Sequence, residues 1–421
     1  MKYRLTILLY VIISGCSNHA SKNDISITKP TVKIVTILPK DAYPFQFDGR
    51  HIIIQAKMND SVAISLLLDT GVQEPDFDSS FIAENRDRLG IKTKPNRGFL
   101  ASPSGLFKIT QRITGSIKLN AFSETKEFHG ALMIAESIRS SLGADAIFPA
   151  YLFFEDKIVL IDLKNQYLRI LSQDTLNDLK RHFVSFPLNG NQYSFFTVSS
   201  KIWIDKLAGH PVNLDGEMEI DIGAPGFLYL FKSQKYISAI LPPDIKTHKI
   251  KTLAFNMKDT VFSEAIIADQ LRLSDTWSFR NAKITLVDQF VNLDPAQIGL
   301  LGNDFLRKFI VIIDYRNKQL YLRPGPEYFI PCKNSDLGMK LSKEPGGKSY
   351  IVVSIYDQTP ITVAGIHLGD MILSINGIPT ERISARKMDS IERSPIGTKL
   401  NFRVQRGQIV FDREITIRNI L

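Results

Sequence analysis

The sequence is poor in cysteine, with only Cys16 and Cys332 among 421 residues. At most one disulfide bond can therefore form within the chain, and stability must come from hydrophobic cores. This length supplies enough chain for more than one domain. The seven histidines are scattered without the spacing of metal ligands, so we predict no metal site and no cofactor.

The chain also lacks a block of basic residues. Its formal net charge is +9, and the excess of lysine and arginine is spread along the sequence. Nucleic-acid binding is therefore not expected. Two catalytic motifs are missing as well: there is neither a Gly-X-Ser-X-Gly elbow nor a His-Glu-X-X-His helix.

One apolar run stands at the start of the chain. Lys2 and Arg4 precede the apolar residues 5–13, and Ser14-Gly15-Cys16 follows. This order is typical of a secretory signal, and the run is too short to span a bilayer. Residues 13–16 also resemble a bacterial lipobox, which would make residues 1–15 a signal peptide and Cys16 the lipidated N-terminus. A plain signal peptide with an incidental cysteine is the alternative.

The lipoprotein resemblance implies an anchor in the bacterial cell envelope. Ser17 after the cysteine implies the outer membrane, with the protein facing the periplasm. Residues 16–41 are polar and lack periodicity at their start, so we interpret them as a tether between the membrane and the folded body. Removing the signal peptide removes Lys2 and Arg4 and lowers the net charge from +9 to +7.

A short pattern of an apolar run, an aspartate and a glycine occurs twice. Asp69-Thr70-Gly71 follows Leu66–Leu68, and Asp221-Ile222-Gly223 follows the apolar Ile220, with an offset of 221 − 69 = 152 residues. A carboxylate at the end of a buried strand indicates a functional role for that residue, because an unpaired buried charge is costly. The glycine allows a sharp turn, and the Thr70 hydroxyl can donate a hydrogen bond.

Two further pairs of segments follow the same order. Residues 158–165 match residues 310–317, again at an offset of 152, and each is followed by another strand-like run. A Leu-Gly-X-Asp sequence precedes each of them, at Leu142 and at Leu301. An ordered repeat of three elements predicts two related lobes, which we place at residues 42–183 and 184–330.

With these motifs the chain resembles bacterial aspartic proteases of the pepsin and retropepsin type. The resemblance implies a catalytic dyad of Asp69 and Asp221, supported by Thr70, Gly71 and Gly223, that hydrolyses peptide or protein substrates with an activated water. The sequence departs from the family at Ile222, where a threonine or serine is usual. A mutual hydroxyl contact between the loops cannot form from that side.

Both lobes read as mostly β. Strands are predicted at residues 52–54 and 62–66 around an Asn59-Asp60 turn, and a hairpin at residues 99–107. By position this hairpin resembles the flap that closes over substrate in the family, although any surface hairpin would give the same pattern. A second hairpin is expected at residues 254–262. The expected fold is mainly β and bilobal, followed by a further domain.

That last domain, residues 331–421, resembles a PDZ domain of the kind found in bacterial proteases. Residues 364–377 carry the resemblance most clearly. It implies a carboxylate-binding loop at Leu337, Gly338 and Met339, which would receive the C-terminus of a peptide added as a strand. Residues 386–393 would form the helix on the other side of the groove. Use of the domain only for packing is the alternative.

Two functions remain open. The first is a membrane-tethered aspartic endopeptidase whose PDZ domain recruits or regulates substrates. The second is a catalytically weak or inactive peptide-binding lipoprotein, in which Asp69 and Asp221 are relics of a protease fold. The intact acids and glycines at the repeat offset favour the first.

Overall fold

The computed structural model describes residues 38–418, except 103–104, 130–131, 137, 191–195, 208–209, 233–236, 238–246, 254–259, 275, 288–295, 333–336, 344–348 and 393. The predicted signal peptide, Cys16 and most of the predicted tether therefore lie outside the described residues. A compact unit begins at Leu38, four residues before the expected start of the first lobe. Asp41 belongs to it, because its carboxylate pairs with Arg169 at 2.7 Å.

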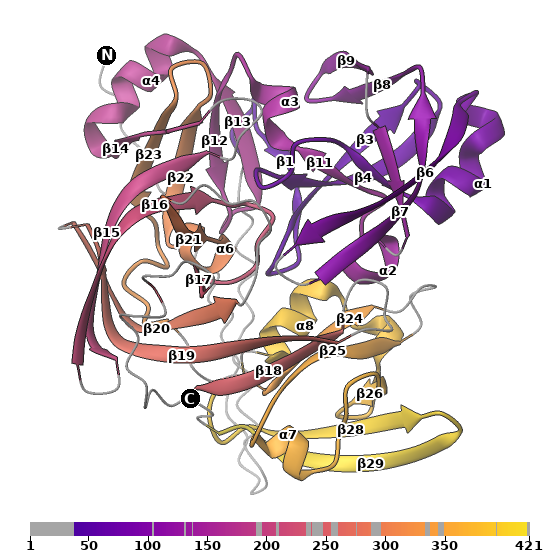
Figure 1. The fold of residues 1–421 in the computed structure, drawn as a ribbon, viewed down its shortest axis with the longest axis vertical. Coiled ribbons are helices and arrows are strands. Elements are labelled where there is room, and N and C mark those ends of the chain that lie inside the picture. Colours follow the sequence, from indigo (N-terminus) through magenta and orange to yellow (C-terminus); the bar gives the residue numbers. More distant parts are fainter. Residues whose placement is uncertain are drawn as a thin grey trace, which may run out of the picture. The chain divides into compact units, whose positions relative to one another are not determined.

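The fold is mainly β, as predicted, and its strands form three sheets (Figure 1). Residues 42–183 are called the first half below, and residues 184–330 the second half. The first half supplies a ten-stranded sheet, and both halves share a six-stranded sheet. A thirteen-stranded sheet runs from the second half into the C-terminal segment.

The six-stranded sheet brings the predicted repeats together. Its order is β1 (Tyr43–Pro44), β13 (Tyr167–Leu171), β12 (Ile158–Asp162), β22 (Phe309–Asp314), β23 (Gln319–Pro324) and β14 (Val184–Pro187). The repeated strands β12 and β22 are antiparallel neighbours, with Ile158 opposite Asp314.

The repeated strands also end in the same way. Asp162 accepts hydrogen bonds from the backbone and side-chain nitrogens of Asn165, and Asp314 accepts the same pair from Asn317, all at 2.8–3.0 Å. Both carboxylates are buried and satisfied by these bonds. The sequence repeat is therefore a repeat of structure at these two turns.

The ten-stranded sheet carries the Asp69 loop. Its order is β6 (Lys92–Ser102), β7 (Gly105–Thr114), β10 (Leu132–Ala135), β5 (Asp76–Asp78), β11 (Ala146–Pro149), β4 (Val62–Asp69), β3 (Ile52–Met58), β8 (Ser116–Ala121) and β9 (Glu124–His129), with β2 (Gln46–Phe47) on β3. The predicted β3–β4 hairpin is present, and its turn residues Asn59 and Asp60 have φ of 47° and 60°. The β6–β7 hairpin is also present, and its tip lies outside the described residues.

The thirteen-stranded sheet carries the Asp221 loop. In the second half its order is β15 (Thr197–Leu207), β16 (His210–Ile220), β21 (Gln297–Leu301), β17 (Leu228–Phe231), β20 (Trp277–Val287), β19 (Thr260–Leu273) and β18 (His248–Leu253). The sheet continues through β25 (Tyr350–Tyr356), β26 (Met371–Ile375), β28 (Lys399–Arg406) and β29 (Ile409–Thr416), with β24 (Met339–Lys343) on β25 and β27 (Ile378–Pro379) on β26. The predicted second hairpin is β18–β19, whose tip is not described.

The described helices are short, as the absence of long helical patterns predicted. They are α1 (Ser79–Leu89), α2 (Ile138–Leu142), α3 (Ala150–Phe154), α4 (Gln173–Leu179), α6 (Asn303–Leu306), α7 (Pro360–Val363) and α8 (Ala385–Glu392), with 3₁₀ turns η1 (Lys180–His182) and η2 (Thr380–Arg382). None of the helices in the described part of the chain has both the length and the apolar character needed to cross a bilayer.

The main hydrophobic core of the two halves is separate from that of the C-terminal segment. One continuous cluster of buried side chains fills the first and second halves, including Leu66, Leu68, Ile220 and Ile222. A separate cluster fills the C-terminal segment, around residues such as Val352 and Phe402. Among several smaller groups, one made of Ile250, Ala265 and Tyr356 lies where β18 pairs with β25.

Candidate active site

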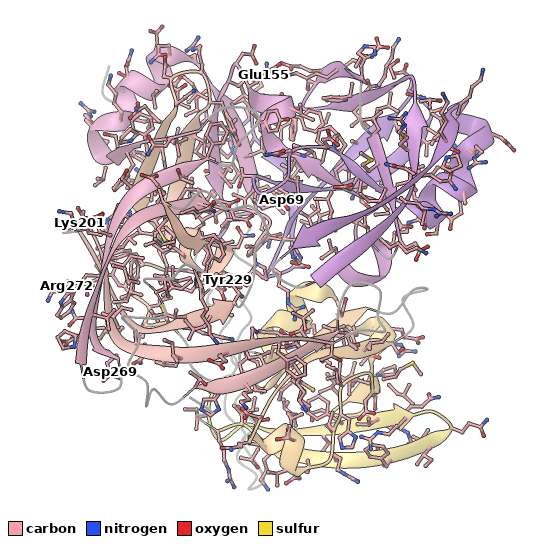
Figure 2. All side chains as sticks on the ribbon, viewed as in Figure 1. Asp69, Glu155, Lys201, Tyr229, Asp269 and Arg272 are labelled. Atoms are coloured by element: carbon pink, nitrogen blue, oxygen red, sulfur yellow. The ribbon has the colours of Figure 1, made fainter. Side chains whose placement is uncertain are left out.

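The two Asp-X-Gly loops lie against each other. Asp69 is the last residue of β4, and Asp221 follows β16, so each acid stands at the end of a buried strand. The carboxyl groups of Asp69 and Asp221 are in hydrogen-bonding contact, and Asp221 is only 6 % exposed. Asp69 is labelled in Figure 2, as is Tyr229, which comes from β17 of the other sheet.

The glycine of each loop stands beside the aspartate of the other. A Cβ atom added to Gly71 would lie 3.0 Å from Asp221 Oδ2, and one added to Gly223 would collide with the Asp69 carboxyl group. Any side chain at these positions would push the acids apart. Both glycines predicted from sequence are therefore explained by close approach between loops from different sheets.

Backbone N–H groups hold the two acids unequally. Asp69 Oδ1 accepts a hydrogen bond from Gly71 N at 2.6 Å. Asp221 Oδ1 accepts two, from Gly223 N at 2.7 Å and Ala224 N at 3.0 Å. Because hydrogen bonds to a carboxylate stabilise its charged form, Asp221 is the better stabilised anion of the pair.

The pKa values follow this difference. Burial, and then the neighbouring Asp221 charge, raise the pKa of Asp69 well above its ordinary range. Burial also raises the pKa of Asp221, but the N–H groups of Gly223 and Ala224 hold it down. In the singly ionised pair the proton therefore belongs on Asp69 and the negative charge on Asp221.

Thr70 ties its loop to the opposite one. Its Oγ1 donates a hydrogen bond to Ile220 O at 2.6 Å and accepts one from Ile222 N at 3.0 Å. Ile222 is buried in the core and offers no hydroxyl in return. Only the first loop therefore contributes a side-chain hydroxyl to the contact between the loops, as the sequence predicted.

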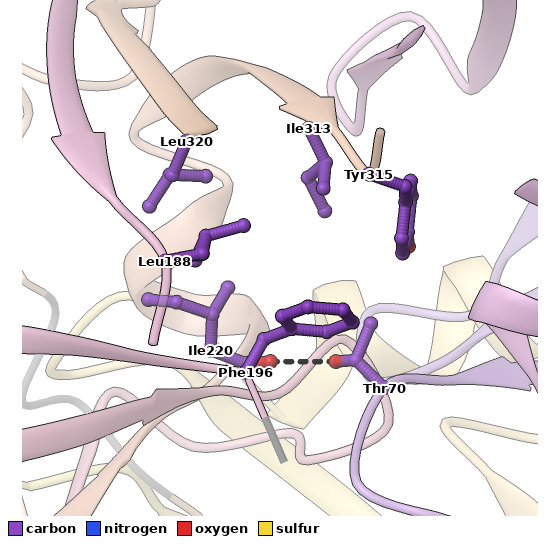
Figure 3. Close-up of a pocket in the computed structure, with 7 residues that line it drawn as sticks. All are labelled: Thr70, Leu188, Phe196, Ile220, Ile313, Tyr315 and Leu320. Carbon is purple, nitrogen blue, oxygen red and sulfur yellow. Dashed lines mark hydrogen bonds between the residues drawn. The ribbon is translucent and has the colours of Figure 1, made fainter. Parts of the chain in front are cut away.

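A small, mainly apolar pocket lies against this contact. Figure 3 shows the hydrogen bond from Thr70 to Ile220 at its edge. The lining residues are Thr70, Leu188, Phe196, Ile220, Ile313, Tyr315 and Leu320. Because this lining is apolar, the buried hydroxyl of Thr70 depends on its two backbone partners in the opposite loop.

Each loop is supported from behind by a parallel strand. In the second half, β21 runs parallel to β16 and ends at Leu301, the first residue of the repeated Leu-Gly-X-Asp sequence. In the first half the strand beside β4 is β11, where Phe148 pairs with Leu68. The Leu-Gly-X-Asp sequences at Leu142 and Leu301 are therefore not structural counterparts, because Leu142 ends α2, before β11 begins.

The two halves have different residues at the end of this parallel strand. Pro149 of β11 takes the place that Gly302 has in the second half, because Pro149 pairs with Asp69 at the end of the parallel ladder. A search for Leu-Gly letters could not find a strand that ends in Phe-Pro. The run Ala146–Pro149 followed by apolar residues was the usable signal.

A third carboxyl group, missed from sequence, joins the pair. Glu219 lies two residues before Asp221 and on the same face of β16, and it is 5 % exposed. Its Oε2 accepts a hydrogen bond from Gln297 Nε2 at 2.8 Å. Burial and the charge of Asp221 raise the pKa of Glu219 well above its ordinary range, which favours the neutral form of this acid.

Asp76 is a fourth buried acid near the pair. It lies on β5 and is 2 % exposed. Burial, and then the charge of Glu74, raise its pKa to about 7. Its negative charge in turn contributes to the raised pKa of Asp69. Among the described residues, no group of three or more His, Cys, Asp or Glu side chains is arranged to hold a metal ion.

The residues predicted to bind a peptide C-terminus lie at the start of β24. Leu337 and Met339 are buried, and Gly338 between them has φ of +82°. A Cβ atom at Gly338 would lie 2.7 Å from Thr359, so this turn needs glycine for both its conformation and its packing. The predicted groove helix is α8, which lies beside β24.

Comparison with known families agrees with the analysis of this segment. The PDZ domain family matches residues 335–417. No curated protein shows a significant match to the chain. The chain therefore carries a PDZ domain near its C-terminus, a domain that suggests peptide binding or regulation.

Proposed function

We propose that this protein is an aspartic endopeptidase that hydrolyses peptide bonds with Asp69, Asp221 and a water molecule. One observation carries the proposal. Two aspartates at the ends of repeated strands are in hydrogen-bonding contact, and the glycine of each loop makes room for the acid of the other. A relic of such a site would have no need to keep both close contacts.

The reaction needs one proton shared by the two acids. Asp221, held as the anion by Gly223 and Ala224, takes a proton from the water as that water attacks the scissile carbonyl carbon. Asp69, which holds the proton, donates it to the carbonyl oxygen. The proton now on Asp221 then passes to the leaving nitrogen, a hydroxyl of the tetrahedral intermediate returns its proton to Asp69, and the C–N bond breaks without a covalent intermediate.

The pH dependence follows from the same arrangement. The active form has a single proton on the pair, and the upper end of its range is set by loss of that proton. Because the pKa of Asp69 is raised well above its ordinary range, activity should persist at higher pH than for two isolated carboxyl groups. Neutral Glu219 adds no negative charge that would oppose ionisation of Asp221.

The remaining parts of the chain suggest how substrate is brought to the site. The PDZ domain would recruit or regulate peptide substrates, with the C-terminal carboxylate at Leu337, Gly338 and Met339. Lipidated Cys16 would hold the enzyme at the outer membrane, facing the periplasm. The proposed substrates are therefore peptides or unfolded proteins of the cell envelope.

The test is cleavage of an unfolded protein by the purified full chain in detergent, at acid and neutral pH. Asp69→Asn and Asp221→Asn should each lower kcat at least about a thousandfold, because each removes the shared proton chemistry while preserving shape. The double variant should be no worse than either single variant. Asp269→Asn, on the exposed face of β19, is the matched control and should keep wild-type activity.

The variants also separate the alternatives. Retained activity in Asp221→Asn would show that the second loop supplies no acid. If the wild type cleaves nothing at any pH yet binds peptides, the second function, a peptide-binding lipoprotein, replaces this one. Ile222→Thr, which brings a hydroxyl to the loop that lacks one, would then be the first attempt to restore activity.

A further inference from the structure

The edge of β24 that faces α8 is already occupied by a side chain. Leu341 N donates a hydrogen bond to Glu392 Oε1 at 2.9 Å. Glu392 is the last residue of α8, and its side chain is 1 % exposed. Within the PDZ domain, a carboxylate of the groove helix therefore accepts a bond from the strand that a peptide would use.

Two cations complete the surroundings of this carboxylate. Arg50 Nη2 contacts both Glu392 oxygens at 2.8 Å, and Lys340 Nζ lies 3.6 Å from Oε2. Arg50 comes from the turn between β2 and β3 in the first half, 342 residues away in sequence. The helix α2 of the first half also lies against β24. The first half thus holds Glu392 in place at the edge of β24.

A peptide that adds to β24 as an antiparallel strand needs the outward N–H groups of that strand. Leu341 N is one of these outward groups, because it donates to a side chain of α8. We propose that Glu392, held by Arg50, is an internal ligand of the PDZ groove, and that a peptide must displace it to bind. The contact between Arg50 and Glu392 is called the latch below.

The latch also indicates the chemistry of the partner. When Glu392 leaves, Arg50 and Lys340 lose a carboxylate at 2.8 and 3.6 Å. A peptide with an acidic side chain beside the residue that accepts the Leu341 N–H would supply a new one, whereas a basic side chain would add a third positive charge. The partner is therefore an extended peptide with a free C-terminus and an acidic residue close to it.

The latch is connected to the proposed active site through one amide. Asn303 Nδ2 donates to Arg50 O and to Ile222 O, each at 2.6 Å. Ile222 is next to Asp221. Displacement of Glu392 should therefore change the position of the Asp221 loop. This last step rests on the proposed protease function, whereas groove occupancy does not.

The test measures binding of a fluorescent peptide with a free, apolar C-terminal residue and a glutamate near it. The full chain is used in detergent, with Asp69→Asn in every sample so that the probe is not cleaved. Glu392→Gln should tighten binding of this probe by about tenfold, because a latch of about 1.4 kcal/mol lowers the competent fraction by that factor. Arg50→Met should give the same gain only for a probe with alanine in place of the glutamate, because it also removes the partner of that glutamate. The double variant should bind no more tightly than either single variant.

Controls make the result specific to the groove. Arg169→Met removes an arginine–carboxylate pair far from β24 in sequence and should leave affinity unchanged. A peptide with lysine in place of glutamate should bind more weakly to the wild type and lose that difference in Arg50→Met. If Arg50→Met fails to fold, Arg50→Lys is used in its place. Arg50→Lys keeps the charge but not the two-point contact with Glu392, so it should bind the probe more tightly than wild type and less tightly than Glu392→Gln.

A folded Glu392→Gln variant that binds the peptide no more tightly than wild type would overturn the proposal. Cleavage is then measured separately, with Asp69 restored. Peptide should change the cleavage rate of wild type and leave that of Arg50→Met unchanged. Absence of all cleavage would count against the protease function alone, since the binding measurements do not use it.

Discussion

The contact of Thr70 with the opposite loop is the clearest case in which one side chain sets the geometry of the site. Its hydroxyl satisfies Ile220 O and Ile222 N, two backbone groups beside an apolar pocket. Without the hydroxyl both groups lose a hydrogen-bond partner in mainly apolar surroundings. The cost of a buried unpaired group is about 1–3 kcal/mol.

Thr70→Val keeps the shape of the side chain and removes the hydroxyl. We expect the free energy of unfolding to fall by roughly 2–4 kcal/mol, since two buried groups lose their partner. Urea unfolding followed by circular dichroism would measure this. Thr70→Ser keeps the hydroxyl and should lose less than half as much. Equal stability of Thr70→Val and wild type would show that the loops are held by packing alone.

Asp76 gives a prediction with a defined pH range. Its folded pKa of about 7 lies above the ordinary value of 3.8, so the folded state binds the proton more tightly than the unfolded state. Stability is therefore full below about pH 4 and falls as the pH rises toward 7. Asp76→Asn removes this loss.

The expected gain for Asp76→Asn is on the order of 4 kcal/mol at pH 8 and close to zero below pH 4, from the energy equivalent of the pKa shift. Urea midpoints measured across this range would show it. Asp178→Asn, at an exposed position of α4, should change the unfolding free energy little at any pH. A gain that did not depend on pH would mean that ionisation of Asp76 is not the cause.

At the scale of elements, short sequence patterns predicted the strands and turns that depend on neighbouring residues. The apolar runs and the Asn59-Asp60 turn predicted β3 and β4, and turn residues with apolar flanks predicted the hairpin at residues 99–107. The second hairpin was expected from its position in the second half. The helix α1 was missed, although its signals were present: Asp78 caps its N-terminus and Gly90 ends it with φ of 62°. The helix has few buried apolar residues, Phe81, Ile82 and Leu89, so it lacks a strong helical pattern between these caps.

Pairings between distant segments could not be predicted. The place of β11 beside the Asp69 loop, the burial of Glu219 and the latch at Arg50 each depend on contacts across many residues. A single sequence contains no local signal for such contacts. The two aspartates were found only because the motif occurs twice at one offset.

The pairing of β18 with β25 joins the second half to the PDZ domain in one sheet. Ile250 is 5 % exposed and packs with Tyr356 and Ala265, and Thr252 Oγ1 donates to Ser354 Oγ at 3.0 Å. A sheet that is continuous in this way should transmit unfolding from one part to the other.

We therefore expect wild type to unfold in one calorimetric transition. Ile250→Asp places a charge in the small cluster with Tyr356, which should cost several kcal/mol and separate the PDZ domain as a second transition. Lys249→Asp adds a similar charge at an exposed position of the same strand and should keep a single transition. Two transitions in the wild type would contradict this coupling.

At the scale of the whole molecule, the predicted lipid anchor would decide whether the protein is attached to a membrane. The predicted anchor, Cys16, lies outside the described residues, and its role comes from the sequence Ser14-Gly15-Cys16 alone. A multiply acylated cysteine binds a membrane stably, whereas a single chain does not.

Cys16→Ser should abolish lipidation and release the protein from the membrane fraction into the soluble fraction. Membrane fractionation followed by immunoblotting measures this. Cys332→Ser removes the other cysteine and should leave the distribution unchanged. A Cys16→Ser protein that still required detergent for extraction would show that the lipobox interpretation is wrong.

The register of β18 also constrains how the chain can be made. Ile250 pairs with Tyr356, which a ribosome adds 106 residues later. At about 5–20 residues per second, β18 waits between roughly 5 and 20 s for its neighbour. During that interval the strand is an open edge that another nascent chain could pair with. Productive folding of this protein therefore depends on prompt synthesis of the segment that contains β25.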